Sequence, residues 1–286
     1  MSTIKRSVPL PHARHAQADS TRLRSALGGA NRYALSTGLA LVVLVIWQGV
    51  TFFFDIPRWL LPSPWQTLAA LGDSPGLIFR HAAVTAREAL AGFALSVVFG
   101  FGLGVAISHS RLVEKALYPY VIASQAIPVI AIAPILVVWL GFGMLPKVIV
   151  IVLITFFPIT INTVDGLRNV DPEMATLMRS LGASRWQHFR MVQLPSALPL
   201  IFSGARIAAA VSVIGAILGE WVGASEGLGY LITRSSAQFL TARVFASVLI
   251  LSLMGIALFY AVSLVERVAT PWSRRDAAAK GARERR

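Results

Sequence analysis

The sequence contains no cysteine and few charged residues. Without a thiol, the chain can form no disulfide, no thiolate metal site and no cysteine nucleophile. Only 14% of its 286 residues are charged, whereas 56% are hydrophobic. A soluble protein of this length needs more charge to cover its surface, so the composition predicts an integral membrane protein that contacts the lipid bilayer directly.

Sequence motifs of ATP binding and of hydrolytic enzymes are also absent. No G-x-x-x-x-G-K-[ST] loop occurs, so the chain has no ATP site of its own. Neither H-E-x-x-H nor G-x-S-x-G is present, and no set of His and carboxylate residues clusters, which argues against a membrane enzyme and a metal site. Acidic residues, the usual handles for protons and sodium ions, are scarce within the apolar segments. An ion-coupled secondary transporter therefore remains as the alternative to a transporter driven by a separate ATPase.

Six segments are long and apolar enough to be membrane helices, for which about 20 residues are needed. They comprise residues 33–54, 89–108, 116–146, 148–164, 194–219 and 244–265. Gly141, Gly143 and Pro146 separate the third from the fourth. The predicted fold class is therefore all-α, a polytopic membrane protein with six transmembrane helices.

Lys and Arg are unevenly distributed between the segments that join these helices. With the N-terminus inside, 19 of the 26 basic residues fall on the cytoplasmic side and five on the opposite side. This bias predicts that both termini are cytoplasmic, and it explains the net charge of +13 without a nucleic-acid partner. The predicted organisation is a cytoplasmic tail (1–32), a first helix (33–54), a periplasmic loop (55–84), a membrane core (85–266) with a cytoplasmic loop (165–195), and a cytoplasmic tail (267–286).

Two rows of small residues recur at four-residue spacing. One row is Gly92, Ser96, Gly100 and Gly104, and the other is Gly204, Ala208, Ser212 and Ala216. Small side chains let membrane helices approach closely, so these rows predict helix packing within the subunit. A second interpretation is that they line a pathway.

Polar residues at membrane depth are candidates for the solute pathway, because burying them in lipid is costly. The candidates are Gln125, Asn162, Ser212 and Glu220. Pro128, Pro134 and Pro158 predict kinks or irregular backbone beside them. Arg206 lies near the predicted cytoplasmic end of its segment, where its side chain can reach the interface.

The loop at 165–195 predicts two short helices. Asp171 is a suitable N-cap, Pro172 fits the first helical position, and Gly182 fits a left-handed C-terminal position. Ser184 and Gln187 have the spacing of a capping box that opens a second helix. Met174, Leu177, Met178 and Leu181 form an apolar stripe. Such a loop lies on a lipid surface or docks into a groove of another protein.

The same loop resembles that of the inner-membrane permeases of ATP-binding-cassette (ABC) importers. Their pattern is EAA, three residues, Gly, nine residues, Ile, one residue and Leu-Pro. Here Gly182 is followed after nine residues by Val192, then by Gln193 and Leu194-Pro195. The EAA positions hold Thr176-Leu177-Met178, so the acidic residue is missing there, and Glu173 lies three residues earlier on the same helical face.

The resemblance extends from about residue 56 to residue 272 and implies a function. Leu61-Pro62-Ser63-Pro64 and Gly219-Glu220-Trp221 look like segments of permeases for nitrate, sulfonates, taurine, pyrimidine-type vitamin precursors or riboflavin. The resemblance implies the fold of type I importer permeases and a loop that couples to the ATPase. The implied coupling residues are Glu173, Thr176, Leu177, Met178, Gly182, Ala183, Ser184, Trp186, Leu194 and Pro195.

The resemblance also implies partners and a location. These permeases work in the bacterial inner membrane as a dimer, here expected to be two copies of this chain, with cytoplasmic ATPase subunits and a periplasmic solute-binding protein. ATP and magnesium belong to the ATPase, and this chain is expected to bind no cofactor. The segments 55–84 and 222–243 are expected to contact the binding protein, with Gly223, Gly227 and Gly229 giving the second segment freedom to re-form on docking.

Overall fold

The computed structural model describes residues 34–272. The chain divides into two units, and the boundary along the sequence falls between Gln66 and Thr67. The described residues form helices joined by loops and contain no strand. This confirms the all-α prediction. The N-terminal tail predicted at 1–32 and most of the C-terminal tail predicted at 267–286 lie outside the described residues.

The first unit contains one apolar helix, Ala34–Phe53. Its 20 residues are about 30 Å long, which matches the thickness of the hydrocarbon core. Almost all of its side chains are exposed in the subunit, as suits a helix whose solvent is lipid. Further along the chain, the Ser63 and Gln66 side chains each accept a hydrogen bond from the other residue's backbone N–H, and this capping box opens α2 (Pro64–Asp73).

The second unit contains four long helices that are apolar enough to cross a membrane. They are α3 (Pro75–His109), α6 (Met144–Arg168), α9 (Leu194–Gly223) and α11 (Thr241–Ala269). The 35 residues of α3 are about 52 Å long, so this helix extends beyond a hydrocarbon core of about 30 Å. The segment 55–84, which the sequence predicts as a loop, therefore contains α2 and the first ten residues of α3.

The predicted third span is a broken helix and not a straight one. α4 (Arg111–Ala123) continues into a 3₁₀ turn, Ser124–Ala126, and the chain then bends by 100° into α5 (Val129–Leu140). Pro128 causes the break, because it has no N–H to donate and holds Ile127 in an extended conformation. Pro134 and Pro158, in contrast, lie inside continuous helices. With the broken pair counted as one span, residues 34–272 contain six spans.

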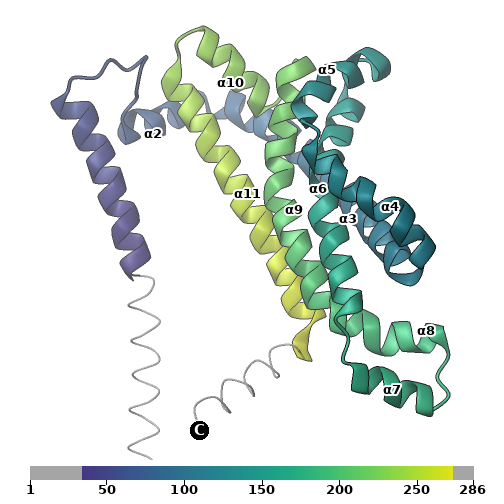
Figure 1. The fold of residues 1–286 in the computed structure, drawn as a ribbon. Helices are drawn as coiled ribbons and strands as arrows, with labels where there is room; N and C mark the ends of the chain where they lie inside the picture. Colours follow the sequence, from purple (N-terminus) through teal and green to yellow (C-terminus); the bar gives the residue numbers. More distant parts are fainter. Residues whose placement is uncertain (1–33, 273–286) are drawn as a thin grey trace, which may run out of the picture. The chain divides into compact units, whose positions relative to one another are not determined.

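α6 lies at the centre of the second unit, between α3 and α9 (Figure 1). α3 and α6 run parallel, and every fourth residue of one meets every fourth residue of the other at a constant separation of 59 positions. The pairs are Glu88–Lys147, Gly92–Ile151, Ser96–Thr155, Gly100–Ile159 and Gly104–Thr163. Close approach at the glycines places backbone against side chain, and the Ser96 and Thr155 hydroxyl oxygens lie 2.6 Å apart.

α9 packs antiparallel on the other side of α6. Gly204 lies against Pro158 and Asn162, and Gly219 lies against Lys147. A Cβ at Gly219 would stand 3.1 Å from Lys147 Cα, which is tighter than ordinary contact. The rows of small residues therefore pack helices within the subunit, as the first of the two interpretations predicts.

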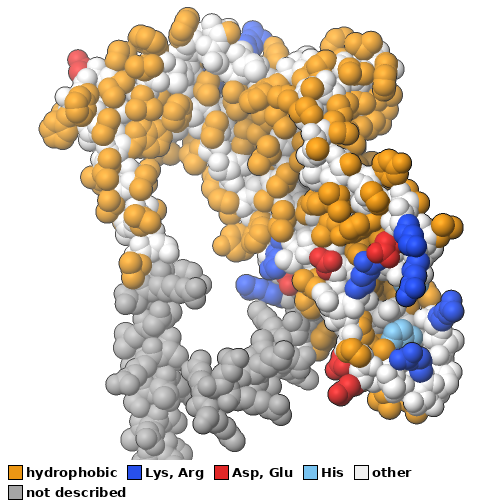
Figure 2. Space-filling view, in the orientation of Figure 1, with side chains coloured by type: hydrophobic (Ala, Val, Ile, Leu, Met, Phe, Trp, Pro, Cys, Tyr) orange, Lys and Arg blue, Asp and Glu red, His pale blue; other side chains and the backbone are white. Residues whose placement is uncertain are grey.

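The ends of the second unit differ in character. α7 (Pro172–Ser180) and α8 (Arg185–His188) lie at one end of the long helices, and α10 (Leu228–Ala237) lies at the other (Figure 1). In the view of Figure 2, hydrophobic side chains cover most of the surface of this unit, and charged side chains gather toward the end with α7 and α8. A largely hydrophobic surface with charged side chains gathered at one end is typical of a membrane-spanning bundle.

Candidate functional site

The chain between α6 and α9 folds as the sequence predicts. The Asp171 carboxylate accepts a hydrogen bond of 2.9 Å from the Glu173 N–H, and Pro172 occupies the first helical position of α7. α7 ends before Gly182, whose φ of 71° lies in the left-handed region that favours glycine. No atom lies within 4 Å of a Cβ built at Gly182, so backbone conformation alone selects glycine there.

The second short helix begins as predicted and continues into the next long helix. The Ser184 hydroxyl accepts from the Gln187 N–H at 3.2 Å, and the Gln187 carbonyl oxygen accepts from the Ser184 N–H at 2.8 Å. α8 then continues through a π-helical turn, Phe189–Gln193, directly into α9. α9 therefore begins at Leu194, where the fifth apolar segment was predicted to begin, and residues 185–223 form one continuous helical run.

This α7–α8 loop, residues 171–193, exposes large apolar side chains. The exposed fractions are 52% at Leu177, 73% at Leu181 and 66% at Trp186, and no residue of α7 is buried. A short helix whose large apolar side chains are exposed in its own subunit is typical of a docking element. Of the implied coupling residues, Glu173, Thr176, Leu177 and Met178 lie on α7, Gly182, Ala183 and Ser184 in the turn, Trp186 on α8, and Leu194 and Pro195 at the start of α9.

Basic side chains lie next to the exposed stripe. Arg179, Arg185, His109 and His188 line a cavity of about 490 Å³ between the end of α3 and the α7–α8 loop. Thr176, at the position of the missing acidic residue, accepts a hydrogen bond of 3.2 Å from the Arg179 guanidinium. The loop therefore presents a basic rim in the place where the family pattern has a carboxylate.

The α7–α8 loop is anchored to the long helices by an aromatic contact and a small apolar cluster. The ring of Phe189 packs edge-on against that of His109 in α3, with centroids 5.0 Å apart. Phe189 also packs with Leu167 of α6 and with Ala197 and Ile201 of α9. Phe189 thus connects the loop to three long helices.

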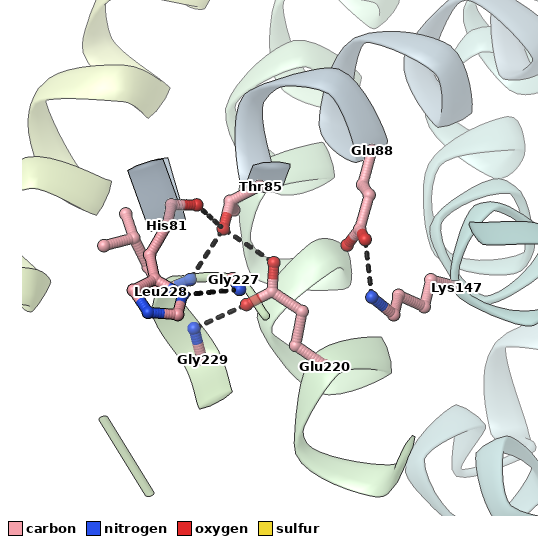
Figure 3. Close-up of polar contacts among 8 residues, drawn as sticks. All are labelled: His81, Thr85, Glu88, Lys147, Glu220, Gly227, Leu228 and Gly229. Atoms are coloured by element: carbon pink, nitrogen blue, oxygen red, sulfur yellow. Dashed lines mark hydrogen bonds and ion pairs between the residues drawn. The ribbon is translucent and has the colours of Figure 1, made fainter. Parts of the chain in front are cut away.

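A second polar site, the α10 clamp, lies at the other end of the bundle and consists of His81, Thr85 and Glu220 (Figure 3). It binds three successive backbone N–H groups at the start of α10. The Gly227 N–H donates to His81 Nδ1 at 3.0 Å, and the Leu228 N–H donates to Thr85 Oγ1 at 2.8 Å. The Gly229 N–H donates to Glu220 Oε2, and Thr85 Oγ1 donates to Glu220 Oε1 at 2.6 Å. A carboxylate at a helix N-terminus is stabilised by the helix dipole.

The α10 clamp corrects the expectation that glycines give this segment freedom. A Cβ at Gly227 would clash with the Glu220 carboxylate, and Gly227 has a φ of 113°. A Cβ at Gly229 would stand 2.9 Å from Glu220 Oε2. These two glycines are required for close approach to a buried acid, so the segment that begins α10 is fixed and not free.

Next to the α10 clamp lies a buried ion pair that the sequence analysis missed. Lys147 Nζ stands 2.5 Å from Glu88 Oε1, and the lysine is only 7% exposed (Figure 3). Lys147 is one of the five basic residues predicted on the external side, and the structure places it in the first turn of α6. Glu88 Oε2 has no hydrogen-bond partner among the described residues. The residues around Lys147 in the sequence do not indicate that Glu88, 59 positions earlier, is its partner.

The four predicted pathway residues do not lie together. Gln125 is exposed, in the turn that precedes the 100° bend. Asn162 is half-buried and donates to the Pro158 carbonyl at 2.8 Å. Ser212 is fully buried and donates to the Ala209 carbonyl, and Glu220 is 2% exposed within the α10 clamp. Ser212 and Glu220 are thus enclosed by protein in this conformation.

Arg206 lies on α9 and pairs with α11. Its guanidinium nitrogen is 3.1 Å from Glu266 Oε2, and its guanidinium carbon stands 5.9 Å from the centre of the Phe259 ring. A similar contact joins Arg168 of α6 to Glu114 of α4 at 2.8 Å. Both pairs lie near the end that carries α7 and α8.

His81, Thr85 and Glu88 share one face of α3, at the i, i+4 and i+7 positions of a helix. This polar spacing directly before an apolar segment was the available signal for the α10 clamp and the buried pair. His81 falls in the segment 55–84 that was predicted as a loop, so the three residues were not predicted to share a helical face.

Comparisons with known proteins agree with these features. A family model described as the binding-protein-dependent transport system inner membrane component matches residues 96–274. The formylaminopyrimidine transport permease protein ThiX of Halalkalibacterium halodurans is 44% identical over 237 residues, which cover 82% of this chain and 94% of ThiX. The riboflavin transport system permease protein RibX of Chloroflexus aurantiacus is 39% identical over 239 residues, which cover 81% of this chain and 87% of RibX.

A solved structure shares the fold. A chain of the MetNI methionine ABC transporter in an inward-facing conformation matches with a TM-score of 0.61 and 20% identity, and the match covers 69% of this chain and 98% of that chain. At this identity the likeness establishes the permease fold alone. The family match and the two relatives together show that the chain belongs to the inner-membrane components of binding-protein-dependent transport systems, and that it is the permease component of an ABC importer and not itself an enzyme.

Proposed function

We propose that this permease carries a small heterocyclic vitamin precursor of the pyrimidine or flavin kind across the bacterial inner membrane. The observation that carries the proposal is the similarity, over about four fifths of the chain, to relatives named for formylaminopyrimidine and for riboflavin. Sulfonates, taurine and nitrate, which the sequence resemblance also suggested, are the competing solutes.

We further propose that two copies of the chain assemble with two ATPase subunits, which bind the ATP and magnesium, and with a periplasmic binding protein. The α7–α8 loop is the part of the chain best suited to contact an ATPase. Its side chains Leu177, Leu181 and Trp186 are largely exposed in the subunit, and burial of such side chains typically contributes about 1.5–3 kcal/mol each. The α7–α8 end would then be cytoplasmic, and the α10 end periplasmic.

Alternating access would follow from movement of this loop as a rigid body. Because α8 continues without a break into α9, a displacement of the ATPase surface would move the whole helical run from Arg185 to Gly223. The contact between Phe189 and His109 would carry the same movement to α3. Of the four predicted pathway residues, Gln125 and Asn162 are still proposed to line the solute pathway, because neither is buried in this conformation.

Uptake measurements test the solute. Cells that express this chain with its ATPase and binding protein should accumulate labelled formylaminopyrimidine or riboflavin, and an excess of unlabelled taurine should not compete. Competition by taurine or a sulfonate, with no uptake of either heterocycle, would move the solute to the sulfonate class. Uptake by this chain alone, driven by an ion gradient without ATP, would favour the secondary transporter.

A pair of variants at one position tests the docking surface. Leu177→Asp places a charge in the apolar stripe of α7, at a side chain that is 52% exposed in the subunit. The variant chain should insert and fold normally but fail to bind the ATPase in a co-purification from lipid nanodiscs. Leu177→Met keeps an apolar side chain of similar volume and should bind as the wild type does. Equal recovery of the ATPase with Leu177→Asp would refute this docking surface.

A further inference from the structure

A cavity beside the α10 clamp has a strongly basic lining. It is enclosed by three elements: the first two turns of α3, the helix α10 and the first turn of α11. These lie at the end of the bundle opposite α7 (Figure 1). Its volume is about 240 Å³. The polar side chains that line it include Arg80, His81, Arg234, Ser235, Gln238 and Arg243, together with the hydroxyls of Ser225 and Tyr230.

Three guanidinium groups at this cavity are little neutralised. Arg234 donates a hydrogen bond of 2.9 Å to the Tyr230 hydroxyl, which positions the guanidinium without cancelling its charge. Arg80 stands 3.8 Å from Glu226, and both side chains are at least half exposed. An exposed pair at this distance contributes little. With one carboxylate against three arginines, the cavity carries an excess of positive charge.

Ser235 supplies a second, independent indication of a ligand. Its side chain is 1% exposed and lines the cavity, yet its hydroxyl has no hydrogen-bond partner among the described residues. Buried hydroxyls are normally hydrogen-bonded, so an unpartnered one that lines a cavity indicates a hydrogen-bonding ligand. His81 adds to this polarity, because its Nδ1 accepts from the Gly227 N–H and its Nε2 therefore carries the proton of the neutral ring.

We propose that this cavity binds a small oxyanion group: a carboxylate, sulfonate or phosphate. Guanidinium groups offer paired donors that match the oxygens of such a group, and the Ser235 hydroxyl can donate one more hydrogen bond. The volume is below the roughly 300–1,000 Å³ of pockets for whole organic ligands, which suits an anionic group and not a complete solute.

The oxyanion has two possible sources. One is a free anion in solution. The other is an acidic side chain of a protein that docks at this end, and this source rests on the proposed function, because it requires a binding protein. In both cases the arginines would bind the same kind of oxyanion group. The two sources differ in whether that group is a free ion or part of a protein, and two measurements distinguish them.

The first measurement uses sulfate as the probe and the full-length chain in lipid nanodiscs. Thermal unfolding is followed by tryptophan fluorescence in sodium sulfate and in sodium chloride of equal ionic strength. Binding should raise the Tm in sulfate by about 2–4 °C. The double variant Arg234→Gln/Arg243→Gln should lose this rise, and Ser235→Ala should reduce the affinity for sulfate roughly fivefold. Arg87→Gln, an exposed arginine of α3 outside the cavity lining, is the matched control and should keep the rise.

The second measurement compares the affinity of the binding protein for the assembled transporter. If the ligand is an acidic side chain, sulfate alone has little effect, but Arg234→Gln/Arg243→Gln weakens docking at least tenfold while Arg87→Gln does not. Arg80→Gln, at an exposed position, replaces the double variant if the latter does not fold. A sulfate effect that persists in the variants, or no sulfate effect together with unchanged docking, overturns the proposal. If no binding protein docks to the wild type, the proposed function is wrong. The sulfate measurement alone then tests whether the cavity binds an oxyanion.

Discussion

Lys147 Nζ lies 2.5 Å from Glu88 Oε1, and this ion pair is the first contact in the row that joins α3 to α6. Both side chains are shielded from the surface, and the neighbouring pair of the row is Gly92 against Ile151. A charged pair thus stands at the head of a face that is otherwise made of small and apolar residues. Burying two charges is costly, and the cost is offset only while both partners are present.

Removing one partner of this pair should destabilise the chain more than removing both. Lys147→Met leaves Glu88 as an unpaired buried carboxylate and should cost about 3–5 kcal/mol of folding free energy. The double variant Glu88→Gln/Lys147→Met should recover most of that loss. Thermal unfolding in nanodiscs measures both. A single variant as stable as the wild type would show that the pair is not buried in the membrane-inserted protein.

Two glycines of α3 should respond oppositely to the same substitution. A Cβ at Gly104 would stand 2.6 Å from Thr163 Cβ, whereas a Cβ at Gly102 meets nothing within 4 Å. Gly104→Ala should therefore destabilise the chain by about 1–3 kcal/mol through overpacking. Gly102→Ala should leave the stability unchanged or raise it by up to about 1 kcal/mol, because alanine favours the helix. Equal effects at the two sites would contradict the packing of α3 on α6.

Gly227→Ala should release the start of α10. The added Cβ would displace the Glu220 carboxylate, and the φ of 113° would be strained at about 1–3 kcal/mol. Amide hydrogen exchange at Leu228 and Gly229 should accelerate by roughly 10- to 100-fold. Gly76→Ala, where the added Cβ meets nothing within 4 Å, is the control and should leave that exchange unchanged.

The turn between α7 and α8 should discriminate between side chains by backbone conformation alone. Gly182 has open space around it but a φ of 71°. A β-branched residue pays roughly 1–2 kcal/mol in that region, whereas Asn tolerates it. Gly182→Val should therefore lower binding-protein-stimulated ATP hydrolysis by the assembled transporter by up to about 5- to 30-fold, and Gly182→Asn should retain it. Full activity of Gly182→Val would show that the geometry of this turn does not affect coupling.

The sequence predicts well those parts of the fold that local signals govern. Hydropathy identified the apolar segments, and Asp171, Gly182 and the Ser184–Gln187 capping box set the bounds of α7 and the start of α8. In each case the structure is decided locally, by a hydrogen bond between residues a few positions apart or by the backbone angle of a single residue.

Contacts between distant segments were beyond sequence reasoning. Lys147 looked external, because the hydrophobic pattern does not reveal a carboxylate 59 positions earlier on a neighbouring helix. Gly227 and Gly229 looked flexible, because their requirement arises from Glu220, which reaches them only after α9 and α10 have packed. The cavity formed by Arg80, Arg234 and Arg243 likewise depends on packing between three helices.

The constant offset between α3 and α6 limits how chain length can vary in this protein. Deleting one residue of α3 between Glu88 and Gly104 would turn the later part of the row by about 100° about the helix axis, away from Thr163. Bulkier side chains would then face α6, and the row could not be restored by sliding one helix along the other. Length changes should therefore be accepted around the turn at Ser110 and around Gly141–Gly143, which lie between the two helices and outside the row.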